Sequence, residues 1–102
     1  MADSNSPQVA FSSKAKVEIA DSWDWYEDQL KGLGDRFYKE LFRCIARIKS
    51  HPERYPLKIG SYREIKLAVF PFVLIYHFDS NKQLATVLSV FHTARHPGRK
   101  FP

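Results

Sequence analysis

Apolar side chains recur at intervals of three and four residues along the first half of the chain, and this spacing predicts helices. The first helix is expected over residues 14–31, with an apolar stripe of Ile19, Trp23, Tyr26 and Leu30. Ser12 or Ser13 can cap it by accepting a backbone N–H bond. The second helix is expected over residues 35–51, with a stripe of Phe37, Leu41, Cys44, Ile45 and Ile48. It ends there because the residue before Pro52 is pushed out of helical geometry. The glycines of Gly32-Leu33-Gly34 break the pattern between the helices, which predicts an antiparallel helical hairpin.

The remaining apolar positions follow strand patterns. A short strand is predicted at residues 8–12, and residues 62–69 alternate as a half-buried strand does. Residues 72–78 are apolar on both faces, which suits a central strand, and residues 83–91 form the last strand. Residues 53–61 are predicted to be a loop, since they contain Pro56 and Gly60. The order β-α-α-β-β-β predicts an α+β fold in which the helical hairpin packs on one face of a small, mainly antiparallel sheet.

Length and composition add that this is one ordered domain. The chain has 102 residues, 44% of them hydrophobic and 15% aromatic, which is typical of a single globular core. We predict a disordered lead at residues 1–7 and a single domain over residues 8–102. The polar N-terminus carries no secretion signal pattern, and no apolar run approaches the roughly 20 residues that span a bilayer. A cytoplasmic protein without a membrane partner is therefore expected.

The lone cysteine, Cys44, cannot form an internal disulfide, and it falls on the apolar stripe of the second helix, which predicts a core residue. A cysteine-rich zinc site is not expected, and no metal or cofactor is predicted.

Charge is segregated along the chain. Residues 1–42 carry five Lys/Arg against eight Asp/Glu, a net of −3, and residues 43–102 carry eleven against three, a net of +8, which together give the formal +5. No acidic residue follows Asp79, whereas the C-terminal segment contains His92, Arg95, His96, Arg99 and Lys100. Such a tail suits an anionic partner, either a phosphate backbone or an acidic protein, and a solvated, frayed terminus is the equally weighted alternative.

Several side chains could carry chemistry, and each has an ordinary structural interpretation. Glu64 and Lys66 lie two apart on a strand, hence on one face. They could act as a base and an electrostatic stabiliser, or they could belong to an ordinary solvated surface. His77 is more typical of a packed or surface histidine than of a catalyst. His92 has a side-chain pKa suited to a general base, or it bonds to the backbone at a strand end. Trp23 and Trp25 cannot share a helix face, so one is expected in the core and the other can mark a protein contact.

An ordered set of short segments spans residues 9–100. It comprises Asp24-Trp25-Tyr26-Glu27, Gly32-Leu33-Gly34-Asp35-Arg36-Phe37, Ile48 through His51-Pro52-Glu53-Arg54-Tyr55-Pro56, Arg63-Glu64-Ile65, Phe70-Pro71-Phe72 and His92-Thr93-Ala94-Arg95-His96-Pro97. With the order of elements, this set resembles the RelE/ParE superfamily of bacterial toxins from type II toxin–antitoxin modules. The details are closer to the ParE-like branch, often labelled plasmid stabilisation proteins.

The resemblance implies a growth-inhibiting toxin that is neutralised by a cognate antitoxin, whose disordered segment folds over the toxin. RelE-like members cut messenger RNA on the ribosome, whereas characterised ParE members inhibit DNA gyrase. Metal-free RNA cleavage needs a general base, clustered cations and an acid within reach of one another. This chain has Val73 where RelE-like enzymes place an arginine, which counts against that chemistry.

Three hypotheses follow. The first is a ParE-like toxin, not an enzyme, that binds a protein target, DNA gyrase. The second is a RelE-like endoribonuclease, an mRNA interferase acting on the ribosome, with the catalytic candidates Lys66, His92 and Arg95. The third is a non-toxic binding module of the same fold.

Other residues are candidates for contacts. Target or anion contacts are predicted at Arg63, Arg95, His96, Arg99 and Lys100. Antitoxin contacts are predicted at Trp25 and Tyr26. Heterotetramer and homodimer are the assemblies left open.

Overall fold

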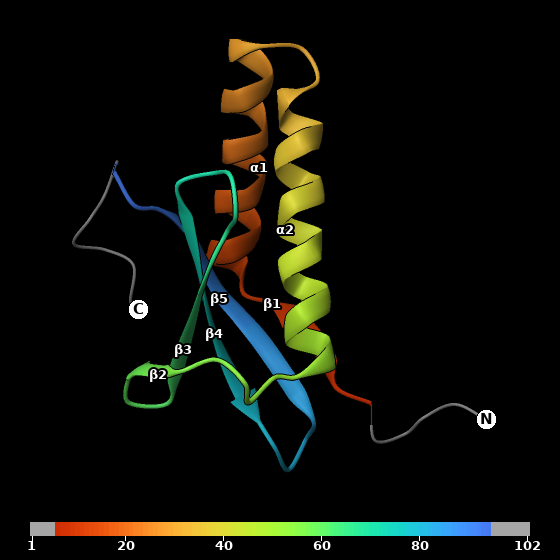
Figure 1. Cartoon of the computed structure of the whole chain (residues 1–102), viewed down its shortest axis with the longest axis vertical. Helices are drawn as coiled ribbons and strands as arrows, with labels where there is room; N and C mark the ends of the chain where they lie inside the picture. Colours follow the sequence, from red (N-terminus) through yellow and green to blue (C-terminus); the bar gives the residue numbers. More distant parts are fainter. Residues whose placement is uncertain (1–5, 95–102) are drawn as a thin grey trace.

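The computed structural model describes residues 6–94, which form a five-stranded sheet with a helical hairpin on one face (Figure 1). The elements are β1 (Gln8–Phe11), α1 (Ser13–Gln29), α2 (Leu33–Ser50), β2 (Leu57–Ile59), β3 (Tyr62–Lys66), β4 (Phe72–Asp79) and β5 (Leu84–His92). The strands lie side by side in the order β1-β5-β4-β3-β2. β1 runs parallel to β5, and the other neighbours are antiparallel, which confirms the predicted fold class. Most of the predicted N-terminal lead, and the tail beyond Ala94, lie outside the described residues.

Two strands, β2 and β3, differ from the prediction by more than one residue. The segment predicted to be a loop contains β2, a three-residue edge strand that is exposed throughout. Its alternating Leu57-Lys58-Ile59 run is too short to predict a strand between Pro56 and Gly60. β3 ends at Lys66 instead of continuing to Val69. The chain turns there, because the Leu67 N–H donates to the Phe72 carbonyl at 3.1 Å and the Phe72 N–H donates to the Phe70 carbonyl at 2.7 Å. Pro71 has no N–H to extend the ladder.

Side-chain oxygens accept backbone N–H groups at the start of each helix. The α1 N-terminus is capped by Ser12, whose Oγ accepts the Ala15 N–H at 3.0 Å, as predicted. Gly32 has a φ of 90°, a left-handed conformation that favours glycine. The Glu27 carboxylate accepts the backbone N–H groups of Gly32 at 2.8 Å and Gly34 at 3.0 Å. Glu27 therefore satisfies backbone donors at the start of α2 that have no partner within the helix.

Gly34 lies in close contact with Trp23 across the hairpin. A Cβ added at this glycine would lie 2.7 Å from Trp23 Nε1, closer than carbon and nitrogen pack. The indole N–H donates to Asp35 Oδ1 at 3.1 Å. Trp23 therefore clamps α1 onto α2, and only glycine fits beneath it.

The main core fills the space between the hairpin and the sheet. From α2 it takes Phe37, Leu41, Cys44 and Ile48, which confirms most of the predicted stripe. The Cys44 side chain is fully buried, as predicted, and burial raises the pKa of its thiol. Tyr76 of β4 is also buried, and its hydroxyl donates to the Pro52 carbonyl at 2.6 Å. Burial raises the pKa of Tyr76 to about 12.

A carboxylate from α1 covers part of the edge of β5. β1 pairs with β5 only from Leu84 to Val87. Just beyond this segment, Glu18 Oε1 accepts the Val90 N–H at 3.0 Å and the Ser89 hydroxyl at 2.8 Å. A charged group on an exposed strand edge discourages pairing with another strand. Glu18 therefore ties α1 to the sheet and protects this edge.

Candidate functional site

The sheet face opposite the helices carries a second apolar cluster. Val73, Ile75 and Phe91 are buried there, with Tyr62 packed against them. Glu64 and Lys66 of β3 pair with Ile75 and Val73 of β4, which puts them on this face together, as their spacing predicted. Glu64 is buried and Lys66 is exposed. The position beside Lys66, where the resemblance to RelE-like enzymes would imply an arginine, is Val73, which is only 2% exposed.

Lys66 and His92 do not share a face of the sheet. His92 of β5 pairs with Phe72, and the two rings make an edge-on contact with 5.0 Å between centroids. Phe72 belongs to the main core under the helices, so the His92 ring is on the helix side. Its Nδ1 accepts the Ala94 N–H at 3.2 Å, the backbone bond expected of a strand-end histidine.

The hollow beside Lys66 is mostly apolar. Its volume is about 310 Å³, and its lining consists of Lys66, Leu67, Phe70, Pro71, Phe72, Val73 and Thr93. The structure therefore does not bring together the catalytic candidates Lys66 and His92, and the third, Arg95, lies outside the described residues. Within residues 6–94, no group of three His, Cys, Asp or Glu side chains could hold a metal ion.

The predicted anion contacts are described only at Arg63. Its Nη1 donates to the backbone carbonyls of Tyr55 at 2.5 Å and Glu53 at 3.2 Å, which holds the segment before β2. Arg63 lies on β3, which is not next to β5, because β4 lies between them. The other candidates, His96, Arg99 and Lys100, lie outside the described residues with Arg95.

The two tryptophans of α1 differ in exposure, but the prediction that one of them lies in the core was wrong, because Trp23 is only partly buried and belongs to neither apolar cluster. Trp23 packs on the hairpin turn, whereas Trp25 is 44% exposed. Tyr26, the other predicted antitoxin contact, is buried, and its ring packs against Phe37 and Phe70 in the main core. Trp25 is therefore the exposed member of the predicted pair.

An apolar groove lies on the outside of the hairpin, next to β1. Its volume is about 270 Å³, and its lining consists of Phe11, Lys16, Ile19, Ala20, Tyr38 and Phe42. Phe42 is 59% exposed although it is aromatic. Sequence reasoning missed this groove. The signal was the pair of aromatic residues four positions apart on α2, Tyr38 and Phe42, beside the core stripe.

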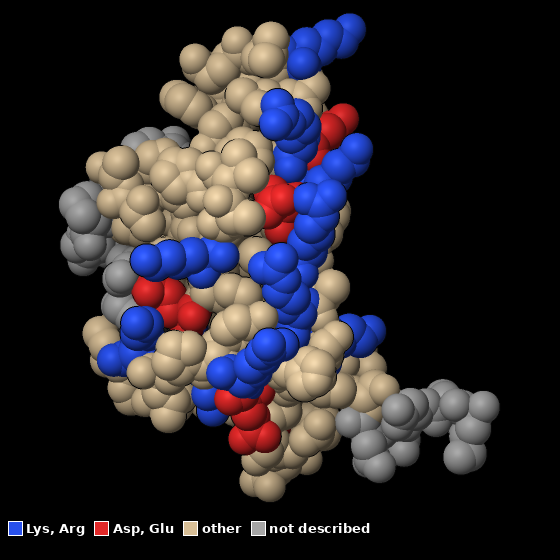
Figure 2. Space-filling model, in the orientation of Figure 1, with Lys and Arg blue, Asp and Glu red and all other residues tan. Residues whose placement is uncertain are grey.

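A row of cations runs along another flank of α2. Lys and Arg gather over this helix in Figure 2. We call this row the basic stripe, and it comprises Arg36, Lys39, Arg43 and Arg47, all exposed. Their spacings of three and four residues place them on one helix face. The sequence located these residues off the apolar stripe, but it did not show what they border.

Within the part of the chain that the structure describes, no helix is long and apolar enough to cross a membrane. An antiparallel hairpin on one face of a small sheet, with β1 returning parallel beside β5, is the architecture of the RelE/ParE superfamily. The family model described as the ParE toxin of type II toxin–antitoxin systems, parDE, matches residues 9–97. The chain therefore belongs to the ParE toxin family.

Solved structures agree with this fold. The chromosomal ParDE toxin–antitoxin system from P. aeruginosa gives a TM-score of 0.75 at 12% identity, covering 87% of this chain and 98% of that one. The intact RelBE toxin–antitoxin complex from E. coli gives 0.62 at 20% identity, covering 85% and 96%. A mutant E. coli RelE toxin in complex with an antitoxin RelBc peptide gives 0.61 at 22% identity, covering 83% and 81%. No curated protein matches the chain in sequence.

Proposed function

We propose that this toxin arrests bacterial growth by binding DNA gyrase, not by cutting RNA, and that a cognate antitoxin neutralises it. The observation that argues against RNA cleavage is the apolar surroundings of Lys66. Phosphoryl transfer without a metal depends on several polar groups preorganised around one phosphate. Here the neighbour of Lys66 is the buried Val73, and His92 belongs to the other face of the sheet. Neither arrangement favours a nuclease centre built from these residues.

The contact with gyrase is assigned to the basic C-terminal segment. Arg95, Arg99 and Lys100 follow β5 with no acidic residue after Asp79 in the sequence. Unneutralised charge of this kind steers an acidic protein surface onto the toxin and speeds association. His96 adds charge when it is protonated.

The antitoxin is assigned to the outer surface of the hairpin. The groove beside Phe42 and the exposed Trp25 offer apolar area on two flanks of the helices. A segment that folds on binding must offset its ordering entropy with such buried area. An amphipathic segment with an acidic face also matches Lys16 at the groove rim. The protein encoded next to the toxin gene is the partner to test, in the cytoplasm where both are made.

Induced expression in a bacterial host tests the toxin's action. We expect growth arrest with filamentation and DNA damage, and messenger RNAs that remain intact in primer extension. Cuts in phase with codons would overturn the proposal and favour the RelE-like alternative. Normal growth with soluble, folded protein would favour the non-toxic binding module.

The antitoxin assignment has its own test. Co-expression with the neighbouring protein should restore growth, and Phe42→Asp in the groove should weaken that rescue while leaving toxicity intact. Lys58→Ala, an exposed change on β2, is the matched control. Equal rescue of the wild-type toxin and the Phe42→Asp variant would contradict docking in this groove.

A further inference from the structure

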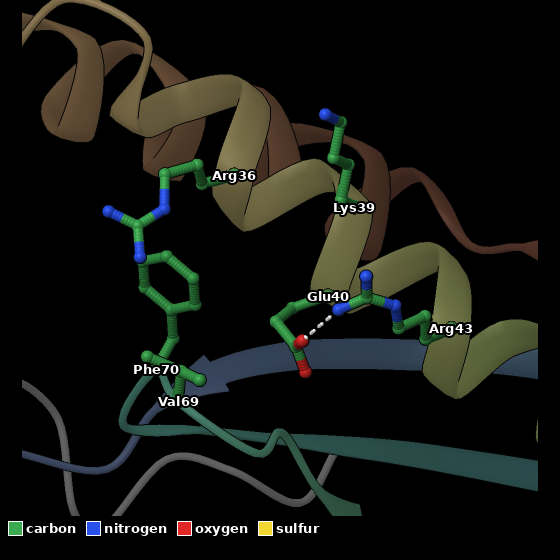
Figure 3. Close-up of a pocket in the computed structure, with 6 residues that line it drawn as sticks. All are labelled: Arg36, Lys39, Glu40, Arg43, Val69 and Phe70. Carbon is green, nitrogen blue, oxygen red and sulfur yellow. Dashed lines mark hydrogen bonds and ion pairs between the residues drawn. The ribbon is translucent and has the colours of Figure 1, made fainter.

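The basic stripe borders a hollow that none of the functions above uses. The hollow has a volume of about 330 Å³ and lies between α2 and the loop that joins β3 to β4. Its lining consists of Arg36, Lys39, Glu40, Arg43, Val69 and Phe70. In Figure 3, Arg36 extends from α2 towards Phe70, and Arg43 and Glu40 meet at the other side of the hollow. The site therefore combines cations, one carboxylate and an apolar rim.

Glu40 is the unusual member of this site. Its side chain is only 10% exposed, and Oε1 pairs with Arg43 Nη1 at 2.6 Å. Oε2 is buried and has no hydrogen-bond partner among the described residues. A buried acceptor without a donor destabilises a protein, and a carboxylate oxygen costs more than a neutral one. A ligand that brings a donor to Oε2 removes this cost.

The chemistry of the hollow favours a polypeptide over a nucleic acid. The phosphates that meet a basic stripe bring only acceptors, so they supply no donor to Glu40. A polypeptide carries a backbone N–H at nearly every residue, and its Asp and Glu side chains can pair with the cations. Val69, which is 68% exposed, and Phe70 offer apolar contact between the charges. Protein segments alternate acidic and apolar side chains, and a phosphate backbone does not.

We propose that this flank of α2 docks an acidic, extended segment of a partner protein. The stripe runs from Arg36 to Arg47, which is about 16 Å along the helix axis, the length of about five extended residues. Carboxylates of the segment pair with Arg36, Lys39 and Arg43. The Glu40 side chain, whose Oε2 has no exposed surface in the free toxin, turns towards the segment and accepts one of its backbone N–H groups. An apolar side chain of the segment packs on Val69.

The stripe and the apolar groove are separate surfaces. Arg36 and Arg43 are on one side of the buried face of α2, and Tyr38 and Phe42 are on the other, since successive residues advance by about 100° around a helix. A partner seated in the groove leaves the stripe accessible. The proposal of this docking surface does not depend on whether the toxin's target is gyrase or the ribosome.

Binding of labelled probes to the purified full-length chain tests the proposal by fluorescence anisotropy. The probes are a peptide of about ten residues rich in Glu and Leu, the same peptide with Gln for Glu, and single-stranded DNA and RNA of equal length. We expect the acidic peptide to bind more tightly than the Gln peptide and either oligonucleotide. Arg36→Ala/Arg43→Ala should weaken it at least about tenfold, because two charge-assisted contacts are lost. Lys49→Ala/Lys58→Ala removes two exposed charges elsewhere and should change the affinity little.

The role of Glu40 needs a probe of its own. A version of the acidic peptide with methylated backbone nitrogens keeps its charges but cannot donate to Oε2. It should bind the wild type about tenfold more weakly than the parent peptide, and the two should bind Glu40→Ala equally. The proposal is overturned if an oligonucleotide binds more tightly than the acidic peptide, or if the control double variant loses as much affinity as Arg36→Ala/Arg43→Ala. A loss of affinity on methylation that is the same in Glu40→Ala would also overturn it. Since no growth effect is measured, gyrase inhibition can fail while this docking surface stands.

Discussion

Lys66 on β3 lies directly across from Val73 on β4, so the exposed ammonium group has a buried valine as its partner in the sheet. Among the described residues that line the hollow at Lys66, a phosphate would meet one positive charge and an apolar wall. In water-exposed surroundings a single cation contributes little to stabilising the charge of a transition state. This pairing is the main reason for preferring a toxin that binds a protein.

Replacing the lysine tests this reasoning. Lys66→Ala should leave growth arrest unchanged, because the side chain is exposed and the proposed contact with gyrase is made by the C-terminal segment. The measurement is the growth rate after induction, with the amount of soluble protein matched to wild type. A toxin inactivated by this single change would support RNA cleavage instead.

The C-terminal arginines should behave differently. Arg95→Ala/Arg99→Ala removes two of the three fixed charges after β5, and we expect it to abolish or strongly reduce growth arrest. Arg54→Ala/Lys58→Ala removes two exposed charges near β2 and serves as the control. Full toxicity of the Arg95→Ala/Arg99→Ala variant would show that these charges of the C-terminal segment are not needed for toxicity.

The contact between Trp23 and Gly34 predicts an unusual sign for a glycine substitution. Gly→Ala within a helix normally stabilises it by about 1 kcal/mol. Here the new Cβ would meet the indole at 2.7 Å, so Gly34→Ala should lower the free energy of unfolding by about 1–3 kcal/mol. Urea denaturation measures this change.

The same substitution can be repeated without the indole. In a Trp23→Ala background the space is open, so Gly34→Ala should become neutral or stabilising. An identical cost in both backgrounds would show that the indole is not the cause.

Tyr76 predicts a loss of stability at high pH. Its pKa is raised by burial to about 12 in the folded chain, above the usual value near 10 in the unfolded chain. Above pH 10 the tyrosine loses its proton in the unfolded chain while it stays protonated in the folded chain. This deprotonation lowers the free energy of the unfolded state. The free energy of unfolding is therefore unaffected by this tyrosine below pH 10, and it falls by up to about 2 kcal/mol as the pH rises to 12.

Tyr76→Phe provides the comparison. It loses the hydrogen bond to the Pro52 carbonyl, which costs about 1 kcal/mol at every pH, but it has no phenol to titrate. The advantage of the wild type in unfolding free energy, about 1 kcal/mol below pH 10, should disappear and then reverse as the pH rises to 12. A constant difference across this range would contradict the role given to the phenol.

Much of the fold could be predicted from the sequence because the helices and the long strands have strong periodic patterns. Phe37, Leu41, Cys44 and Ile48 occupy the core as their spacing predicted. β2 escaped prediction because its alternating run is only three residues long and lies between Pro56 and Gly60. The early end of β3 depends on hydrogen bonds around Phe72, which sequence periodicity does not report.

The candidate site was harder to predict. That Glu64 and Lys66 share a face follows from their spacing alone, and this was confirmed. The separation of Lys66 from His92 depends on which residues of β3, β4 and β5 stand opposite one another, and strand register is a three-dimensional fact. The buried Oε2 of Glu40 depends equally on packing, since the sequence shows only a glutamate that follows Lys39 and precedes Leu41.

The most direct test of the proposed function is DNA supercoiling by purified gyrase in the presence of this chain. We expect wild-type toxin to inhibit supercoiling, and the Arg95→Ala/Arg99→Ala variant to inhibit it much less. The cognate antitoxin, added in equal amount, should restore the reaction. Supercoiling that is unaffected by a stoichiometric excess of folded toxin would contradict gyrase as the target.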